Sequence, residues 1–303
     1  QVASLFPLEI SPNQPFKDLS GISHTAATGE SVKVEFSGEI FETEDHRNWS
    51  DASYKTYCTP IELPFPAKVS KGEKIEQEIQ ISLEGIASKE PEPSEVEIAI
   101  DISPSEIDLP DIGLCLANDY SDSDHQDFKE LCIKHLRIDL DLDDVDENSL
   151  GSALEVTKKL SLKLEISIKA ATNYQLSKFL TTNLDLLGSV SNFIIFSKSS
   201  KVTTTEFISV ARQVLGGAAC ISGGTDLYFT EINRGDSVVP GIDQINFSLN
   251  PQVHSFDDRT VIQNLATQEV IARNASRIAR GLKIGIGPIS LRPRFNPNAT
   301  APE

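Results

Sequence analysis

Polar side chains with catalytic potential follow short apolar runs in the last two thirds of the chain. Carboxylates, a histidine and arginines placed together can position a water molecule, take its proton and stabilise an oxyanion. The members of this set are Asp139, Asp141, Asp143, Asp226, Asn250, Gln252, His254, Arg292 and Arg294. The sequence therefore contains the groups that general-base chemistry needs.

The same residues are equally suited to a structural role. Asp139 and Asp141 alternate with Arg137, so these three groups can form an ion network that satisfies itself inside the protein. Asp143 lies in an acidic stretch that is typical of a solvated loop. His254 precedes Phe-Asp-Asp and is as well placed to tether a loop as to take a proton. Both interpretations stay open at this point.

A second concentration of polar groups lies in residues 41–60, FETEDHRNWSDASYKTYCTP, which contain the only tryptophan, Trp49. One interpretation is structural: the ring packs on one face while its N–H meets a neighbour. The alternative is that this long loop lies over a substrate site, with Trp49 as a platform for a sugar-like ring. The groups that would then reach the substrate hydroxyls are Glu44, Asp45, Arg47 and Asp51.

Common catalytic and metal-binding motifs are missing from the sequence. It has no GxSxG elbow, no HExxH and no other tight histidine cluster. Residues 139–150 fail as a calcium loop, because Asp144 stands where Gly is required and Leu150 where Glu is required. GLKIGIGP lacks the full dinucleotide or phosphate-loop pattern. We therefore predict no metal site and no cofactor, although a carboxylate-rich set permits a divalent ion.

The apolar pattern divides the chain into two regions. Between residues 31 and 102, apolar residues alternate with polar ones, as is typical of half-buried strands. Beyond residue 111, short strand-like runs are separated by helical stretches, as in βα units. The runs cover residues 111–119, 134–142, 162–170, 192–198, 219–226, 244–254 and 282–291. We predict a β-rich domain over residues 1–105 and a TIM (β/α)8-type barrel over residues 106–303.

The alternation within these runs assigns their two faces. In residues 134–142, Leu136, Ile138 and Leu140 share one face and the ionic residues share the other. A barrel under a layer of helices explains this pattern, with apolar side chains outward and polar ones inward. An exposed antiparallel sheet is the alternative, and the intervening helical stretches disfavour it. About a dozen residues follow the seventh run. We therefore expect the eighth strand to come from residues outside this sequence.

The overall composition limits the partners. The chain has 303 residues, 39% of them hydrophobic, which is enough for a substantial core. Its net charge of -18 would repel a phosphate backbone, so nucleic acid is not an expected partner. No apolar run approaches the roughly 18 residues that span a bilayer, so we expect a cytoplasmic protein without a membrane partner. We expect the four cysteines to be buried free thiols. Homo-oligomerisation stays open.

Five segments resemble the D-apionate lactonase family. In chain order they are FPLEISPNQPFKDLSGISH, FETEDHRNWSDASYKTYCTPIELPFP, SGGTDLYFTEINRG, FSLNPQVHSFDD and ISLRPRFNPNAT. The resemblance implies a hydrolase that opens D-apionolactone in the bacterial breakdown of apiose. It also implies a β-rich N-terminal domain, a central TIM barrel and a C-terminal β-domain, so this chain would be truncated at both ends. Glutamine is usual in the family where this chain has His46, which argues against His46 as an essential base.

For a lactone substrate, water attacks the carbonyl with help from a base among Asp226, His254 and Asp139. Arg292 or Arg294 would stabilise the oxyanion and hold the carboxylate product, because a guanidinium matches carboxylate geometry. Arg137, Asp141 and Asn250 complete the predicted substrate contacts. The alternatives are a glycoside hydrolase-like barrel enzyme acting on pentosides and a non-catalytic carbohydrate-binding protein. The ends of the fourth and seventh runs lack the carboxylates that a barrel glycosidase would need.

Overall fold

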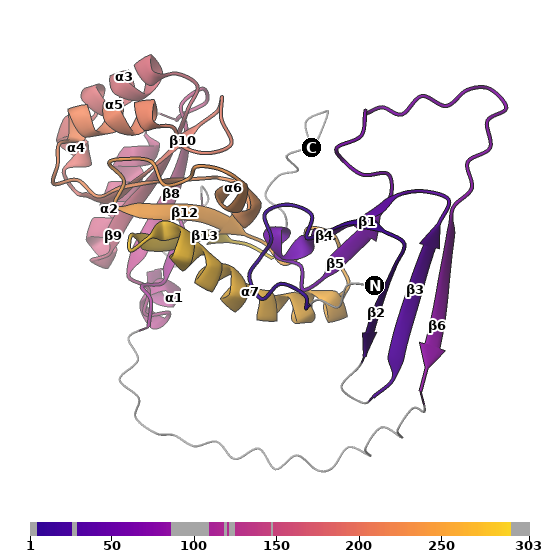
Figure 1. Ribbon diagram of the computed structural model, residues 1–303. Coiled ribbons are helices and arrows are strands. Elements are labelled where there is room, and N and C mark those ends of the chain that lie inside the picture. The colour runs from indigo at the N-terminus through magenta and orange to yellow at the C-terminus, as the bar shows by residue number, and fades with distance from the viewer. Residues whose placement is uncertain are drawn as a thin grey trace, which may run out of the picture. The chain divides into compact units, whose positions relative to one another are not determined.

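The computed structural model describes residues 5–25, 29–85, 109–117, 120, 125–146 and 148–291. Its contacts divide the chain into two compact units, shown in Figure 1. The barrel unit comprises Gln1–Pro12, His46–Ser53 and Leu109–Glu303, and the β unit comprises Asn13–Asp45 and Tyr54–Asp108. The predicted boundary at residue 105 lies outside the described residues. The segment His46–Ser53 is therefore part of the barrel unit, although it is inserted between two strands of the β unit.

Seven parallel strands form the sheet of the barrel unit, in chain order from one edge to the other. They are β7 (Gly113–Cys115), β8 (His135–Asp141), β9 (Lys163–Ala170), β10 (Val190–Ser197), β11 (Ile221–Gly224), β12 (Gln244–Leu249) and β13 (Lys283–Ile289). Each predicted run overlaps one of them, which confirms the strand predictions, although β10 begins two residues before its predicted run. Residues 118–119 of the first run lie outside the described residues.

Helices connect these strands. They are α1 (His125–Glu130), α2 (Ser149–Leu160), α3 (Asn173–Thr182), α4 (Leu184–Leu187), α5 (Thr205–Leu215), α6 (Phe229–Arg234) and α7 (Asp258–Ala279). Figure 1 shows α3, α4 and α5 grouped beside β10. Asp257 caps the start of α7 by accepting from the Thr260 N–H at 3.0 Å. Hydrogen bonds from Ser255 and Thr260 lower the pKa of Asp257.

The two faces of β9 and of β12 separate apolar from polar side chains, as predicted. Ile166 of β9 and Ile245 of β12 are fully buried and belong to the same core cluster as Ile271 of α7. On the other face, Asn192 of β10 donates to Glu165 at 3.2 Å and accepts from Ser222 of β11 at 2.8 Å. The hydrogen-bonded polar groups therefore line the inside of the barrel, where burial requires partners.

Arg137 shows how strongly the sheet curls. Its Nη1 atom donates to the carbonyl of Gly287 at 2.9 Å. Arg137 belongs to β8 and Gly287 to β13, the second and the last strand in the sheet order. Such a contact across the interior requires a sheet that is almost closed, as in a barrel. The described residues thus form a nearly closed, seven-stranded TIM-like barrel.

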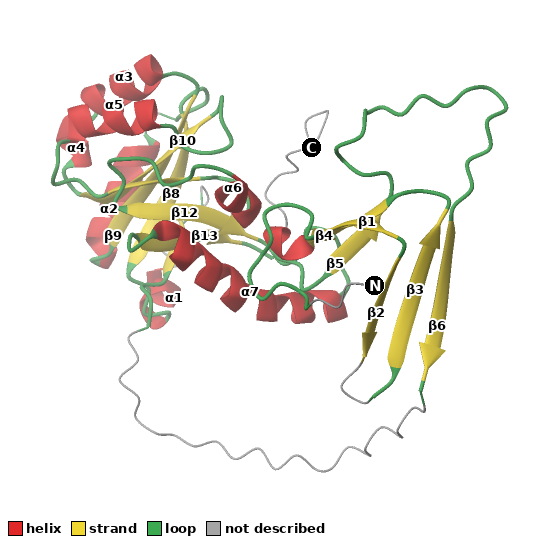
Figure 2. Cartoon of the chain, viewed as in Figure 1, coloured by secondary structure: helices red, strands yellow, loops and turns green. Residues whose placement is uncertain are grey.

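The β unit contains two three-stranded antiparallel sheets, β1–β4–β5 and β2–β3–β6. Their strands are β1 (Phe16–Leu19), β2 (Gly21–Thr25), β3 (Ser31–Ser37), β4 (Phe41–Asp45), β5 (Tyr54–Tyr57) and β6 (Glu78–Glu84). Figure 2 shows only strands and loops for residues 13–25, 29–45 and 54–85. This confirms the prediction of an all-β region, and the predicted strand at residues 96–102 lies outside the described residues.

One expectation about the cysteines was wrong. None of the four forms a disulfide, but Cys115 and Cys132 are exposed and Cys58 and Cys220 are only partly buried. Cys115 ends the edge strand β7, and Cys132 lies in the turn after α1, so neither position is covered by a second layer. Among the described residues, no helix is long and apolar enough to cross a membrane.

Candidate functional site

The segment His46–Ser53 is held in the barrel unit by two asparagines. It begins with a single 3-10 turn, η1 (His46–Trp49). Asn233 of α6 donates to the side chain of Asn48 at 2.9 Å, and Asn264 of α7 accepts from the Ala52 N–H at 2.7 Å. The segment is therefore fixed against both helices by hydrogen bonds between groups far apart in the sequence.

The loop after β12 is held in the same way. Asn264 also donates to the carbonyl of Pro251 at 2.8 Å, so one side chain joins this loop to the inserted segment. Asn250 donates to the carbonyl of Ser290 at 2.9 Å and accepts from the Gln252 N–H at 2.7 Å. This loop carries His254, and it lies at the carboxyl end of a barrel strand, where the reactive groups of such barrels sit.

His254 and Asp51 form a hydrogen-bonded pair in this region. The Nδ1 atom of His254 lies 2.7 Å from Oδ2 of Asp51. The Asp51 side chain is 4% exposed, whereas that of His254 is 38% exposed. Ser50, directly before Asp51, has a φ of 78°, in the left-handed region that non-glycine residues rarely occupy. The resulting reversal of the chain lets the Asp51 N–H donate to the His46 carbonyl at 3.3 Å.

Two further aromatic rings, those of His46 and Trp49, pack against His254 of this pair. His46 stacks on His254 with ring centroids 4.2 Å apart and an angle of 10° between the planes. Trp49 meets both imidazoles edge to face, with centroids 6.1 Å from His46 and 5.8 Å from His254. The guanidinium of Arg234 lies 4.9 Å from the centre of the Trp49 ring, which is a cation–π contact. The only tryptophan thus packs against both histidines.

His46, Asp51 and His254 also meet the distance requirement of a metal site. One ligand atom from each of them lies within 4.8 Å of the others. Sequence reasoning considered Asp51 and His254 separately and set His46 aside. The available signal was weak: residues 46 and 49 share one face of a 3-10 turn, because that helix has three residues per turn.

A second polar region lies at the carboxyl ends of β8 to β11. Asp226 follows β11, and its carboxylate, 14% exposed, lies 3.1 Å from the ammonium of Lys169. Gly224 brings the chain there with a φ of 127°, and a Cβ atom at this position would lie 2.1 Å from the Asn246 carbonyl oxygen. Only glycine fits this close approach of two backbones.

Lys198 occupies the same region, between two carboxylates. Its ammonium contacts Asp141 and also Asp143, the latter at 2.5 Å. Partial burial lowers the pKa of Lys198, but hydrogen bonds to the two carboxylates outweigh this and raise it overall. Hydrogen bonds from Lys198 and Gln175 lower the pKa of Asp143. Lys198 and Asp141 border a cavity of about 530 Å³, called here the mouth cavity, whose charged lining residues are Asp141, Lys169, Lys198, Lys201 and Asp226.

Two other predicted site residues, Asp139 and Arg47, form hydrogen bonds outside these two groups. Asp139 accepts two hydrogen bonds from Arg137, at 2.7 and 2.9 Å. Arg47 donates to the carbonyls of three consecutive N-terminal residues, 7–9, at 2.9 to 3.3 Å. These contacts give Arg137 and Arg47 clear structural roles.

Four predicted site residues lie outside the described part of the barrel unit. Glu44 and Asp45 belong to β4 of the β unit. Arg292 and Arg294 lie outside the described residues. Their predicted roles in binding substrate or oxyanion stay predictions.

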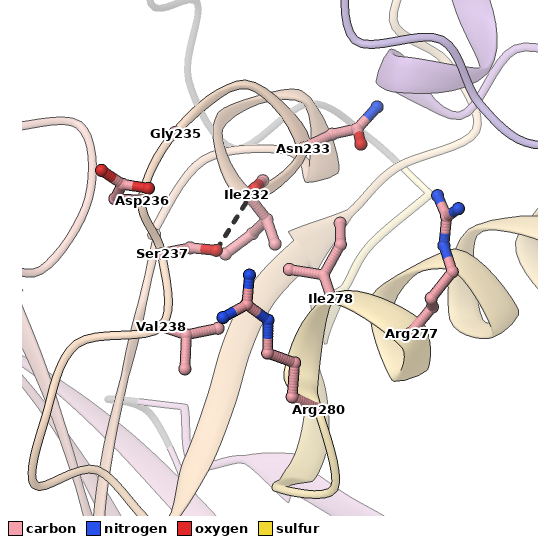
Figure 3. Close-up of a pocket in the computed structure, with 9 residues that line it drawn as sticks. All are labelled: Ile232, Asn233, Gly235, Asp236, Ser237, Val238, Arg277, Ile278 and Arg280. Carbon is pink, nitrogen blue, oxygen red and sulfur yellow. Dashed lines mark hydrogen bonds between the residues drawn. The ribbon is translucent and has the colours of Figure 1, made fainter.

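A further cavity, of about 410 Å³, lies between α6 and the end of α7, as Figure 3 shows. Its walls come from the segments that lead into the amino ends of β12 and β13, including Ser237 and Arg280. Reactive groups in barrels of this type gather at the opposite, carboxyl ends of the strands. We therefore place the candidate site at the Asp51–His254 pair and the mouth cavity.

Comparison with known proteins gives a consistent result along the chain. Residues 1–86 match the family model described as D-apionate lactonase, N-terminal domain, and residues 112–303 match D-apionate lactonase, TIM barrel domain. The chain is similar to the D-apionate lactonase of Brucella anthropi, with 28% identity over 96% of this chain. It covers 51% of that relative, so it spans about half of the relative's length.

Proposed function

Because this chain belongs to the D-apionate lactonase family, we propose that the protein containing it hydrolyses D-apionolactone to D-apionate. The proposal applies to the whole protein, since the chain spans about half of its relative. The geometry of the barrel unit supports a hydrolase in which a side chain activates water. The Asp51–His254 pair is the observation that carries this proposal.

In the proposed reaction, His254 is the general base. The ionised carboxylate of Asp51 only accepts hydrogen bonds, so the proton of the neutral imidazole is on Nδ1 and the lone pair is on Nε2. Nε2 takes a proton from water while the water oxygen attacks the lactone carbonyl. When the tetrahedral intermediate collapses, the C–O bond of the ring breaks and the imidazolium returns the proton to the leaving alkoxide. One water is consumed, and one hydroxy acid is formed.

The other two candidate bases are less suitable. Asp226 forms an ion pair with the ammonium of Lys169. Asp139 accepts two hydrogen bonds from the Arg137 guanidinium, one from Nε and one from Nη2. An ion pair with a cation stabilises the carboxylate, so such a group takes a proton from water less readily. His254 instead has a partner that leaves one nitrogen available, and more than a third of its side chain is exposed.

Substrate binding in this proposal uses hydroxyl groups and one aromatic surface. The mouth cavity presents ammonium donors and carboxylate acceptors, such as Lys169 and Asp226, that suit a polyhydroxylated ring. Trp49 is only partly buried and lies beside His254, which supports its role as a platform. One face of its ring is covered by Arg234, so at most the other face is available. We keep Arg292 and Arg294 as the proposed oxyanion and carboxylate partners.

The proposed mechanism needs no cofactor, and the first test measures this together with the activity. Proton release from D-apionolactone is followed with the full-length protein, with and without EDTA, against the spontaneous rate. Turnover that EDTA does not change supports the lactonase with a protein base. Turnover that EDTA abolishes would contradict a cofactor-free reaction. If lactone turnover does not exceed the spontaneous rate and the protein cleaves pentosides, it is a glycosidase and not a lactonase. If it binds sugars without any turnover, it is a carbohydrate-binding protein.

A further inference from the structure

The proposed base, His254, and its neighbours His46 and Asp51 provide more potential metal ligands than base catalysis needs. Asp51 and His254 suffice for the proton transfer, yet His46 brings a second imidazole to within ligand distance of both. His46 comes from η1, Asp51 follows that turn, and His254 comes from the loop after β12. The segment and the loop are joined through Asn264, so the three side chains are held together by the fold.

The ligand types select a class of ion. Two imidazole nitrogens and one carboxylate oxygen suit Zn²⁺ and the similar ions Co²⁺ and Ni²⁺. Mg²⁺ and Ca²⁺ prefer sites made mostly of oxygen atoms, and this cluster offers one carboxylate. Three protein ligands would leave a zinc ion at least one position for water.

Burial shows which ligands are fixed. His46 and Asp51 are 7% and 3% exposed, so both are held inside the barrel unit. The side chain of His254 is 38% exposed. Its ring must turn for metal binding, because its plane is nearly parallel to that of His46 and the in-plane lone pairs of two stacked rings do not point at one position. Turning the ring also separates Nδ1 from Asp51.

We propose that His46, Asp51 and His254 bind one divalent transition-metal ion of the Zn²⁺ class, and that this ion inhibits the reaction. Inhibition follows because the ion takes a lone pair of His254 and disturbs the Asp51–His254 pair that orients the base. The binding part is independent of the proposed function, whereas the inhibition part rests on it.

Zinc binding is measured first, without any lactone, on the untagged full-length protein freed of metal. Equilibrium dialysis against ZnCl₂ with elemental analysis gives the stoichiometry and Kd. We expect one ion per chain at this site, and an increase in Kd of more than tenfold in His46→Gln. The matched control is His24→Gln, which removes an exposed histidine of β2 in the β unit and should keep the wild-type Kd. An equal Kd in wild type and His46→Gln would overturn the site.

A folding defect in the variant is separated from lost binding in two ways. Circular dichroism checks the fold of His46→Gln, and His254→Gln removes a different, more exposed ligand and should also raise the Kd. In addition, Co²⁺ bound to the wild-type protein should give the visible absorption of a low-coordinate cobalt ion, which both variants should lose. Unchanged absorption in both folded variants would place the ion elsewhere.

The inhibition part is tested by activity. Zn²⁺ should lower the lactonase rate of the metal-free wild type, EDTA should restore it, and His46→Gln should require more than tenfold more Zn²⁺. A metal-free protein that Zn²⁺ activates would confirm the site and overturn inhibition. If the protein hydrolyses no lactone, the inhibition part fails together with the proposed function, while dialysis still decides the binding part.

Discussion

The two polar regions at the carboxyl ends of the barrel strands differ in the partners of their carboxylates. In the mouth cavity, both acids face a lysine: Asp226 faces Lys169, and Asp141 faces Lys198, which also contacts Asp143. At the other region, the nearly buried carboxylate of Asp51 faces the partly exposed imidazole of His254. The first arrangement balances charge, whereas the second orients an imidazole ring.

This difference teaches that residue type alone does not identify a base. Asp226, Asp139 and His254 were equivalent candidates in the sequence, and their partners distinguish them. Asp226 and Asp139 each pair with a cationic side chain, whereas His254 pairs with the carboxylate of Asp51. We therefore expect variants of these residues to change different kinetic and thermodynamic quantities.

The largest expected effect comes from the base itself. His254→Gln should lower kcat by about 10²- to 10⁴-fold, the usual contribution of general-base catalysis. Asp226→Asn should mainly raise KM, because it alters a proposed hydroxyl contact and not the proton transfer. Steady-state kinetics with D-apionolactone measure both, and circular dichroism checks that each variant is folded.

Asp51→Asn refines the same comparison. Because Asp51 positions His254, Asp51→Asn should lower kcat, with little change in KM. The decrease in kcat should be smaller than that caused by His254→Gln. A purely structural Asp51 would instead lower the yield of folded protein without changing kcat of the folded fraction. If Asp226→Asn lowers kcat more than His254→Gln, the assignment of the base is reversed.

The next effect concerns stability and uses the Arg137 contacts inside the barrel. Arg137→Met removes hydrogen bonds to Asp139 and to the Gly287 carbonyl. We expect the free energy of unfolding to fall by about 1.5–3 kcal/mol, the typical contribution of a hydrogen bond to a charged group. Urea denaturation measures this change.

Arg273 on α7 provides the matched control for Arg137. It is 66% exposed and lies 3.7 Å from Glu269, four residues earlier on the same helix. Arg273→Met should change the free energy of unfolding by at most about 0.5 kcal/mol, because exposed ion pairs contribute little. Similar small changes in both variants would mean that the contact across the barrel does not stabilise it.

The smallest expected effect is a pH dependence at the amino ends of the strands. Burial raises the pKa of Asp243, but hydrogen bonds from the Ile221 N–H and Arg212 outweigh it, so the pKa is lowered in the folded protein. A lowered pKa stabilises the fold above the unfolded-state value of about 3.9. This stabilisation is lost as the pH falls through the lower, folded-state value.

Asp243→Asn tests this sign. The wild type should exceed the variant in free energy of unfolding at pH 7, and the difference should shrink below about pH 4, near the unfolded pKa of an aspartate. Urea denaturation across this pH range measures it, and the same substitution in an Arg212→Met background should show a weaker pH dependence. A difference that grows on acidification would contradict the lowered pKa.

Much of the fold could be predicted because its signals are local. Alternation within residues 134–142 and 162–170 distinguishes the covered face from the polar face, and the helical stretches between the runs require parallel strands. Strands as short as β1 and β5, four residues each, carry too few alternations to be recognised, so the prediction for the β unit was limited to its longer strands.

The candidate site was less predictable, and the physical reason is distance along the chain. The sequence by itself determined that His254 follows a barrel strand and that Trp49 lies among polar groups. Only the tertiary structure decided that Asp51 pairs with His254 across 203 positions and that His46 stacks on the same ring. Those contacts depend on a 3-10 turn, a left-handed Ser50 and two bridging asparagines, and no periodic pattern in the sequence encodes such side-chain contacts.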